Sequence, residues 1–525
     1  MAAFALLAAL LLAPLRTASA AGERPNRWRH IDAARPVPRT LTEAGELHAH
    51  ARRQVRKEML RAGHSVSATP LPAAQPPSCA GGVLGTIDPA ADYGADPTGR
   101  RDSTQALTTA VMALTNTSAR AADPMADCIV NLGGATLDLD GGEFLISAPL
   151  VIPPHVGNVR IRGGTLRASP SFPPARFLIE IGQAGCTTGC GGKVEKQKVC
   201  NEMIGLDSLF LDSSHVAAGG VLSQATMGTT VGPSCFFIGF VEAGLRVLGG
   251  HETILSDSWL AEYYWSDKHD PASTSIAVEL NGQDNFISNV IVFDYAKMGV
   301  LVNGAATILT GVHTWNGGGV GISINGSYAI QDRVIDCYLD YNSLDLVQPS
   351  AITVKNTFFL DTKARIFPDP SVSSAWTPKP KHPSIEAVVF RENTYNLGDW
   401  GGNESIVIVD SDVADKITPA QCQRFVVEDE ISLSPKKLRQ TRATQTLWQP
   451  NATEFRFDFS DQLIFPWIDT IVSYTVMLPR SVEGFAAPLV QHAAEMPQGS
   501  GEAVAVVRLS ESSDATVTIE VAQCV

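Results

Sequence analysis

Between Gly244 and Asp361, short apolar runs alternate with Gly/Asn turns at a period close to 22 residues. Four glycines stand in one column of this repeat: Gly250, Gly282, Gly304 and Gly326. Each repeat holds two or three β-branched runs and has no room for a helix. One repeat cannot bury its own apolar face, so successive repeats must stack. The pattern therefore predicts an all-β chain whose repeats are the coils of a parallel β-helix.

The register of the repeat specifies which segments stack on one another. We expect strands at residues 245–248, 276–280, 300–303 and 322–325 to lie in one parallel sheet. A second column, seven residues beyond the glycines and Pro349, is mostly polar: Asp257, Asn289, Gly311, Arg333 and Asn356. Asn, Asp and Gly tolerate left-handed backbone, so this column predicts an asparagine-rich ladder of turns.

The segments that flank the repeat predict four parts. Residues 1–20 form an apolar run that ends in small residues, which is typical of a secretory signal peptide, and residues 21–78 form a basic helical and linker appendage. Residues 79–438 are the predicted β-helix domain, with a short helix over 104–115 that caps the open first coil. Residues 439–525 alternate as antiparallel strands do, which predicts a small C-terminal β-sandwich.

Composition favours an exported, folded chain. It is 44% hydrophobic and 18% charged over 525 residues, and Pro14 and Arg16 interrupt the N-terminal apolar run, which argues against a membrane anchor. Four Asn-x-Ser/Thr sequons suggest a glycoprotein: Asn116, Asn325, Asn403 and Asn451. Nine cysteines predict up to four disulfides and one remaining thiol, for which we favour Cys337 in an apolar strand. The group Cys186, Cys190 and Cys200 suggests a disulfide-tied loop in preference to zinc.

Charge is unevenly distributed and limits the partners. The net charge is −14, but residues 21–70 carry +5 and residues 71–525 carry −20. An acidic body of this kind argues against a nucleic-acid partner. An acidic polysaccharide would need a locally basic groove. We expect a monomer with no cofactor and no resident metal.

Several sequence strings resemble known proteins. The stretch DYGADPTGRRDSTQALTTAV is similar to the opening motif of the pectate-lyase-like superfamily of right-handed β-helices. The strings GGHETILSDSWL, NGQDNFISNVIVFDY, TGVHTWNGGGVGISINGS and DRVIDCYLDY resemble the plant quartet-type polygalacturonases, relatives of family 28 glycoside hydrolases. The resemblance implies a right-handed β-helix and a secreted enzyme that cleaves homogalacturonan in the cell wall, in this family during separation of pollen tetrads.

The catalytic motifs of family 28 are missing from the positions that they occupy in that family. Val320 stands at the position of the family histidine, Lys297-Met298 at the aspartate pair, and Thr274-Ser275 at the first aspartate. Inverting hydrolysis needs a carboxylic acid and a carboxylate about 6.5–9.5 Å apart. Coils are spaced by about 4.8 Å, so carboxyls two coils apart suit this chemistry.

Counting along the repeat places Asp294 and Asp340 on one edge, two coils apart, and we predict that they are the acid/base pair. His313 lies nearby and could tune either acid, and Asp270 on the inserted loop 262–270 is the reserve candidate. The expected substrate-binding side chains are Lys297, Arg333, Lys268 and Trp265. Each group also has a plain structural interpretation as a turn carboxylate, a core histidine or a solvated base.

Two other functions compete with hydrolysis. A pectate lyase of the same fold would hold Ca²⁺ between carboxylates, for which Asp267, Asp270 and Glu262 are the candidates. A pectin-binding wall protein without catalysis would explain the missing motifs.

Overall fold

The computed structural model describes residues 85–116, 125, 129–183, 187–188, 195–196, 199–262, 275–315, 319–325, 330–368, 383–396, 407–414, 416–433, 438–479, 490–497 and 502–525. The predicted signal peptide and the 21–78 appendage lie outside the described residues. Trp265, Asp267, Lys268 and Asp270 also lie outside them.

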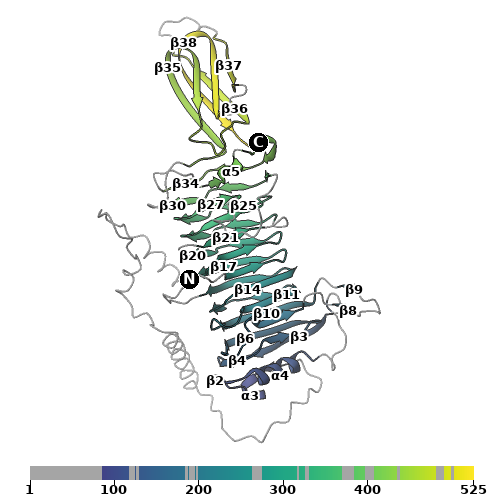
Figure 1. Cartoon of the computed structure of the whole chain (residues 1–525). Helices are drawn as coiled ribbons and strands as arrows, with labels where there is room; N and C mark the ends of the chain where they lie inside the picture. Colours follow the sequence, from purple (N-terminus) through teal and green to yellow (C-terminus); the bar gives the residue numbers. More distant parts are fainter. Residues whose placement is uncertain are drawn as a thin grey trace, which may run out of the picture. The chain divides into compact units, whose positions relative to one another are not determined.

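Most of the described chain is a right-handed parallel β-helix, as the sequence predicts (Figure 1). Thirty of the described strands join in one parallel ladder, and the three strands of a coil lie on three faces. Face A contains β14 (Ala243–His251), β16 (Ile276–Leu280), β18 (Met298–Val302), β21 (Val320–Ile324), β24 (Ser343–Leu346) and β27 (Lys363–Ile366).

Faces B and C share several bent strands. The first halves of β15 (Ile254–Ala261) and β17 (Phe286–Phe293) lie on face B and their second halves on face C. Face B continues through β19 (Ile308–Thr310), β22 (Arg333–Ile335), β25 (Thr353–Lys355), β29 (Val389–Arg391) and β33 (Val426–Glu428). Face C includes part of β10 (Asn201–Asp212), then β13 (Phe236–Ile238), β20 (His313–Trp315), β23 (Tyr338–Asp340), β26 (Phe358–Leu360), β30 (Thr394–Asn396) and β34 (Ile431–Ser432).

The register predicted for face A is confirmed. Leu245 pairs with Val278, Val278 with Val300, and Val300 with Ile322, all in parallel. These four side chains are fully buried, because alternate residues of each strand face the interior of the helix. A repeat of about 22 residues thus closes one coil.

The ladder of turns between faces B and C is also present, with one correction. Asp257, Asn289 and Gly311 have left-handed backbone, with φ between 46° and 62°, and the Asn289 amide donates to Asp257 Oδ1 over 3.2 Å. The next member is Asp336 (φ 55°), whereas Arg333 begins β22. The prediction for Arg333 was wrong because eight residues separate β21 from β22, against five between β18 and β19.

The tight stacking of turns predicts a severe effect of a single methyl group. A Cβ added at Gly304 would lie 1.6 Å from the Gly282 carbonyl oxygen in the preceding coil. We expect Gly304→Ala to cost roughly 1–3 kcal/mol or more, since backbone of the stacked coil must move. Urea unfolding of the two proteins measures this. Gly205→Ala is the matched control, because its nearest neighbour would be the Arg160 side chain at 3.4 Å, and an equal loss there would contradict the argument.

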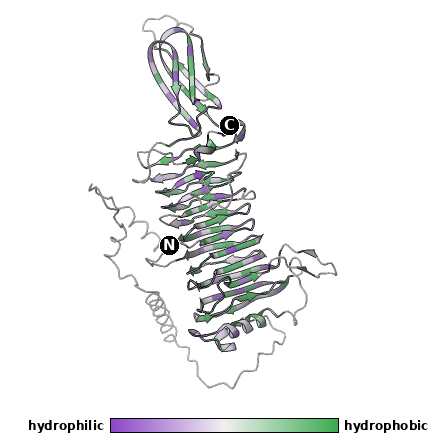
Figure 2. Ribbon diagram, in the orientation of Figure 1, coloured by the Kyte–Doolittle hydropathy of each residue, from purple (hydrophilic) through white to green (hydrophobic). Residues whose placement is uncertain are grey.

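The interior is a continuous apolar core that contains a few buried carboxyls. Figure 2 shows hydrophobic and hydrophilic residues alternating along the coils. Asp332 is 2% exposed and accepts a hydrogen bond from the Thr307 N–H over 2.8 Å, while its Oδ2 has no partner among the described residues. Glu430 is 8% exposed and accepts from the Asn393 amide over 3.1 Å. Burial raises the pKa of both carboxyls to about 7.

The predicted N-terminal capping helix is α4 (Thr104–Leu114). Its buried residues Leu107, Val111 and Leu114 join the main core, where the helix contacts β3 (Val130–Asp138) and β5 (Leu150–Ile152). The preceding turn is organised by Asp96, which accepts hydrogen bonds from Thr98 and from the Arg101 N–H. The hydrogen bonds from Thr98 lower the pKa of Asp96 to about 2.

The C-terminal part is an antiparallel β domain. Its described strands form one four-stranded sheet built on the long β38 (Val504–Ala522), which pairs with β35 (Arg442–Asp458), β36 (Thr470–Met477) and β37 (His492–Glu495). The apolar face of this sheet encloses a second core around Phe455, Phe457 and Phe459. β38 is 19 residues long, and the other three strands all pair with it. The described strands therefore belong to one sheet.

The last coil is closed by residues of this C-terminal domain. A disulfide joins Cys422 to Cys524, and the Arg424 N–H donates to the Cys524 carbonyl over 2.8 Å. Val427 exchanges hydrogen bonds with Thr441. The backbone of the final coil is therefore paired by the chain itself.

Cys200 is also disulfide-bonded. Of the described cysteines, Cys337 is a buried free thiol, as predicted. Cys235 is a second one, so the prediction of a single remaining thiol was wrong. Among the described residues, none of the helices is both long and apolar enough to cross a membrane.

Candidate functional site

Two positions that correspond to family 28 catalytic residues, Met298 and Val320, pair in one column at the start of face A, and Ile276, the residue after Ser275, precedes them in that column. Together with Leu301 these three residues form a buried apolar cluster. This column therefore supplies no carboxyl group.

Asp340 and Asp294 occupy one edge of the helix, where face C turns toward face A. Phe293 pairs with Trp315, and Trp315 pairs with Asp340, so Asp340 lies two coils beyond Phe293. Asp294 is the next residue after Phe293 and begins the turn with φ 48°. At about 4.8 Å per coil, the two backbone positions are about 9–10 Å apart along the axis. This spacing is near the upper limit for an inverting pair.

The carboxyl of Asp340 has the environment of a proton donor. It is half-buried, and its Oδ1 has no hydrogen-bond partner within the part of the chain that the structure describes. Burial raises the pKa of Asp340 to about 7, and the negative charge of Asp361 in the next coil adds to the increase. A carboxyl in this state carries its proton in weakly acidic solution.

His313 lies one coil before Asp340 on the same face. It pairs with Tyr338, and the centroids of the two rings are 4.5 Å apart. Burial lowers the pKa of His313 to about 4, so its imidazole is neutral at the pH where Asp340 is protonated. Its Nε2 atom is buried and has no hydrogen-bond partner among the described residues.

Lys297 lies beside face A. Its backbone N–H donates to the Ser275 carbonyl over 3.0 Å. Burial lowers the pKa of its ammonium group, and the negative charge of Glu279 acts in the opposite direction. The Lys297 side chain thus lies on the outer side of face A, next to the apolar cluster of Ile276, Met298 and Val320. Arg333 is on face B with an exposed side chain, and the structure does not bring it to Asp294 and Asp340.

Sequence reasoning missed a column of face A that is polar in five of six coils. Its members are Arg246, Glu279, Leu301, Ser323, Asp345 and Arg365, of which only Leu301 is apolar. Arg246 contacts Glu279 over 2.6 Å, and Arg365 holds the buried Asp345 through two hydrogen bonds of 2.7 and 2.8 Å. The signal in the sequence is a single polar residue inside apolar strands such as IAVEL and VGISI.

Glu262, one of the three carboxyls considered for Ca²⁺, has a structural role. It is buried at the end of face C, where the Ser275 hydroxyl donates to its Oε2 and the Ala296 N–H donates to that hydroxyl. Among the described residues, no three His, Cys, Asp or Glu side chains are grouped as a metal site would require. The other two carboxyls, Asp267 and Asp270, are outside the described residues.

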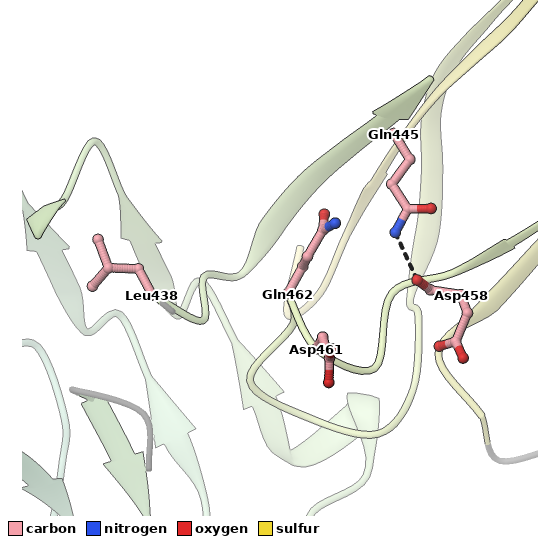
Figure 3. A pocket seen from close by; sticks show the side chains of 5 residues that line it. All are labelled: Leu438, Gln445, Asp458, Asp461 and Gln462. Carbon is pink, nitrogen blue, oxygen red and sulfur yellow. Dashed lines mark hydrogen bonds between the residues drawn. The ribbon is translucent and has the colours of Figure 1, made fainter. Parts of the chain in front are cut away.

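A separate hollow of about 500 Å³ lies at the beginning of the C-terminal domain (Figure 3). It is lined by Leu438, Gln445, Asp458, Asp461 and Gln462. The backbone N–H of Ser460 lowers the pKa of Asp458, and the Gln445 amide donates to the Asp458 carbonyl. None of its residues belongs to face A or face C, so it contributes nothing to the Asp294 and Asp340 edge.

Comparisons with known proteins agree with the sequence strings. No family model matches the chain. It is 29% identical over 444 residues to Polygalacturonase QRT3 of Arabidopsis thaliana, which covers 83% of this chain and 86% of that protein.

Solved structures show a weaker likeness. The tailspike gp61 of Pseudomonas phage phi297 matches with a TM-score of 0.42 and 10% identity over 74% of this chain and 67% of that chain. The catalytic unit of a GH87 α-1,3-glucanase from Streptomyces thermodiastaticus matches with a TM-score of 0.39 and 15% identity over 64% of this chain and 63% of that chain. The resemblance seen in the repeat strings is confirmed by the similarity to the Arabidopsis protein, which extends over most of both chains.

Proposed function

We propose that this chain is a secreted glycoside hydrolase of the polygalacturonase type that cleaves homogalacturonan in the cell wall. The relative of 29% identity supports the activity, and the predicted signal peptide supports export. The observation that carries the proposal is the half-buried Asp340, whose pKa of about 7 keeps a proton available on one edge of the β-helix. By analogy with the family, the biological setting is the separation of pollen tetrads.

The proposed mechanism assigns one role to each carboxyl. Asp340 donates its proton to the glycosidic oxygen, so that the leaving sugar departs as a neutral alcohol. Asp294, in its ionised form, removes a proton from a water that attacks the anomeric carbon from the opposite side. The two-coil separation leaves room for this water, so we expect inversion of configuration.

Two neighbouring residues assist this pair. His313 packs against the ring of Tyr338 in the strand of Asp340, and its imidazole stays neutral at the pH where Asp340 is protonated. Lys297 lies at the end of the same turn as Asp294, where its positive charge attracts the carboxylate of a galacturonate unit. Asp270, Lys268 and Trp265 remain proposed contributors on the inserted loop.

The reaction products test this function directly. Incubation of the purified, secreted protein with polygalacturonate at pH 5 should release reducing ends without ultraviolet-absorbing ends. Products that absorb in the ultraviolet and require Ca²⁺ would establish a pectate lyase, because β-elimination leaves an unsaturated sugar. Heat-inactivated protein is the control for contaminating hydrolysis.

A protein that binds pectin without cleaving it is the second candidate. The buried apolar residues Met298 and Val320, at two of the positions that the family uses for catalysis, favour it. This function would be established if the protein binds polygalacturonate but releases neither kind of end between pH 4 and pH 8.

A further inference from the structure

The outer face of the C-terminal sheet carries an exposed tryptophan. Trp448 in β35 is 61% exposed, which makes it the most exposed tryptophan of the described residues. It pairs with Thr516 of β38, and Thr516 pairs with Met477 of β36, which is 60% exposed. Leu447 and Val517, next to these residues, pack in the second core, so the alternation of the strands directs Trp448 and Met477 outward. Two large apolar side chains therefore share one row of the sheet that faces water.

A glycosylation sequon follows Trp448 by three residues in β35 (Figure 1). Its Asn451 and Thr453 are exposed, whereas Ala452 between them packs against the second core. Asn451 has left-handed backbone, with φ 49°, at an irregularity of the pairing between β35 and β38. The sequon therefore opens to solvent on the outer side of the sheet, as Trp448 does.

The amide of Asn451 is held by its oxygen. The Ser512 hydroxyl donates to Asn451 Oδ1 over 2.7 Å, and the Asn451 backbone N–H donates to Asp514 Oδ1 over 2.8 Å. Asn451 Nδ2 makes no hydrogen bond within the part of the chain that the structure describes. The nitrogen that N-glycosylation uses is thus open to a substituent, while the oxygen fixes the direction of the side chain.

The sequon at Asn325 has the opposite environment. Asn281, Asn303 and Asn325 follow paired residues of face A and form one column, in which the Asn303 amide donates to Asn281 Oδ1 over 2.7 Å. Asn325 is 4% exposed, and its backbone N–H donates to the Val302 carbonyl over 2.8 Å. A chain with an oligosaccharide on Asn325 could not bury this side chain. The folded state therefore requires an unmodified Asn325.

We propose that Asn451 carries an N-linked glycan whose first sugar packs on Trp448, and that Asn325 is unmodified. This rests on the export that is part of the proposed function, because the donor is a lipid pyrophosphate-linked oligosaccharide of the secretory pathway. In the transfer, Asn451 Nδ2 bonds to C1 of the first sugar, and the bond from C1 to the pyrophosphate oxygen breaks. The amide proton passes to a base of the transferase.

The spacing of Trp448 and Asn451 suits this contact. Three residues along a strand span about 10 Å, which an indole and one sugar ring bridge together when the side chains lean along the strand. The apolar C–H face of a sugar stacks on an aromatic ring. A free oligosaccharide would gain little from a single ring, whereas a tethered glycan loses little translational freedom in the contact. The covalent glycan is therefore the occupant that one tryptophan can hold.

The modified sites can be identified by mass spectrometry. The full chain is secreted from insect cells, and its glycans are removed enzymatically in ¹⁸O water, which converts each modified asparagine to labelled aspartate. We expect the label at Asn451 and none at Asn325. Thr453→Ala should remove the glycan at Asn451, and Ser327→Ala, the matched control at the other sequon, should leave the mass of the glycans unchanged. A secreted protein with unmodified Asn451, or with a glycan on Asn325, would overturn the proposal.

The contact with Trp448 is tested by a double-mutant cycle. In glycosylated protein, Trp448→Ala should raise the unfolding equilibrium constant in urea by about threefold to tenfold, and Trp448→Phe should raise it less. In the Thr453→Ala background, Trp448→Ala should have little effect. Trp259→Ala is the matched control, because Trp259 is 44% exposed in β15 of the β-helix and should respond equally with and without the glycan.

Two results would reject the contact. One is an equal effect of Trp448→Ala with and without the glycan, and the other is a wild-type dimer that disappears in Trp448→Ala. The outcome is also separable from that of the hydrolase. Reducing ends released by a secreted protein with unmodified Asn451 would reject the glycan and leave the hydrolase. A glycan on Asn451 in a protein that releases no reducing ends at any pH would support the glycan and reject the hydrolase.

Discussion

Asp340→Asn should lower kcat on polygalacturonate by about 100- to 10,000-fold, the range that a general acid contributes. The amide preserves the shape of the side chain and removes the proton that the leaving oxygen needs. In the wild type, kcat should fall as pH rises through about 7, because the Asp340 carboxyl loses its proton there. Asp294→Asn should cause a loss of similar size. Reducing-end assays over a pH series measure both effects.

The control for these variants is Asp336→Asn. Asp336 belongs to the same coil as Asp340, but it is exposed at the turn between faces B and C, where it accepts a hydrogen bond from the Asn356 amide over 2.6 Å. An asparagine there keeps an acceptor oxygen, so activity should be unchanged. Full activity of Asp340→Asn and Asp294→Asn would refute the assignment.

The second large effect is a loss of stability as pH rises from 5 to 8. The pKa values of Asp332 and Glu430 are about 7 in the folded protein, against ordinary values of 3.8 and 4.5. The folded state therefore binds more protons than the unfolded state in this interval. The stabilisation is complete below about pH 4 and is lost as pH rises through about 7. Each group contributes roughly 3–4 kcal/mol, at 1.36 kcal/mol per pKa unit.

Two substitutions isolate these carboxyls. Asp332→Asn and Glu430→Gln cannot ionise, so each should flatten the pH dependence of the free energy of unfolding measured in urea. His313 acts in the opposite sense, because its lowered pKa favours the folded state at higher pH. Asp336→Asn should leave the slope unchanged. An unchanged slope in both Asp332→Asn and Glu430→Gln would show that these two carboxyls titrate normally.

The strand register was predictable because it depends on a local pattern. The column of Gly250, Gly282, Gly304 and Gly326 reports the length of a coil, and inward-facing residues must be apolar in every coil. Arg333 was misplaced because the turn between β21 and β22 is three residues longer than the turn between β18 and β19. A count of seven residues from Gly326 therefore ends before the position that Asp336 occupies. The two-coil relation of Asp294 and Asp340 agrees with the strand pairing, because Asp294 was counted back from Gly304 and Asp340 back from Pro349, and neither count crosses the longer turn.

The chemistry of the edge was less accessible from sequence. The raised pKa of Asp340 depends on how deeply the side chain is buried and on the charge of Asp361 in the next coil, and neither is a property of the local string.

The closure of the last coil by Cys524 and Thr441 has a consequence for assembly. A parallel β-helix ends in strands whose N–H and C=O groups are open on one side, and such an end is a template on which another chain can add, as in a growing fibre. Here the backbone of Arg424 and Val427 is already occupied, and the Cys422–Cys524 bond fixes the occupying segment covalently. At these positions the end of the β-helix is paired within its own chain, which opposes the addition of a second chain there.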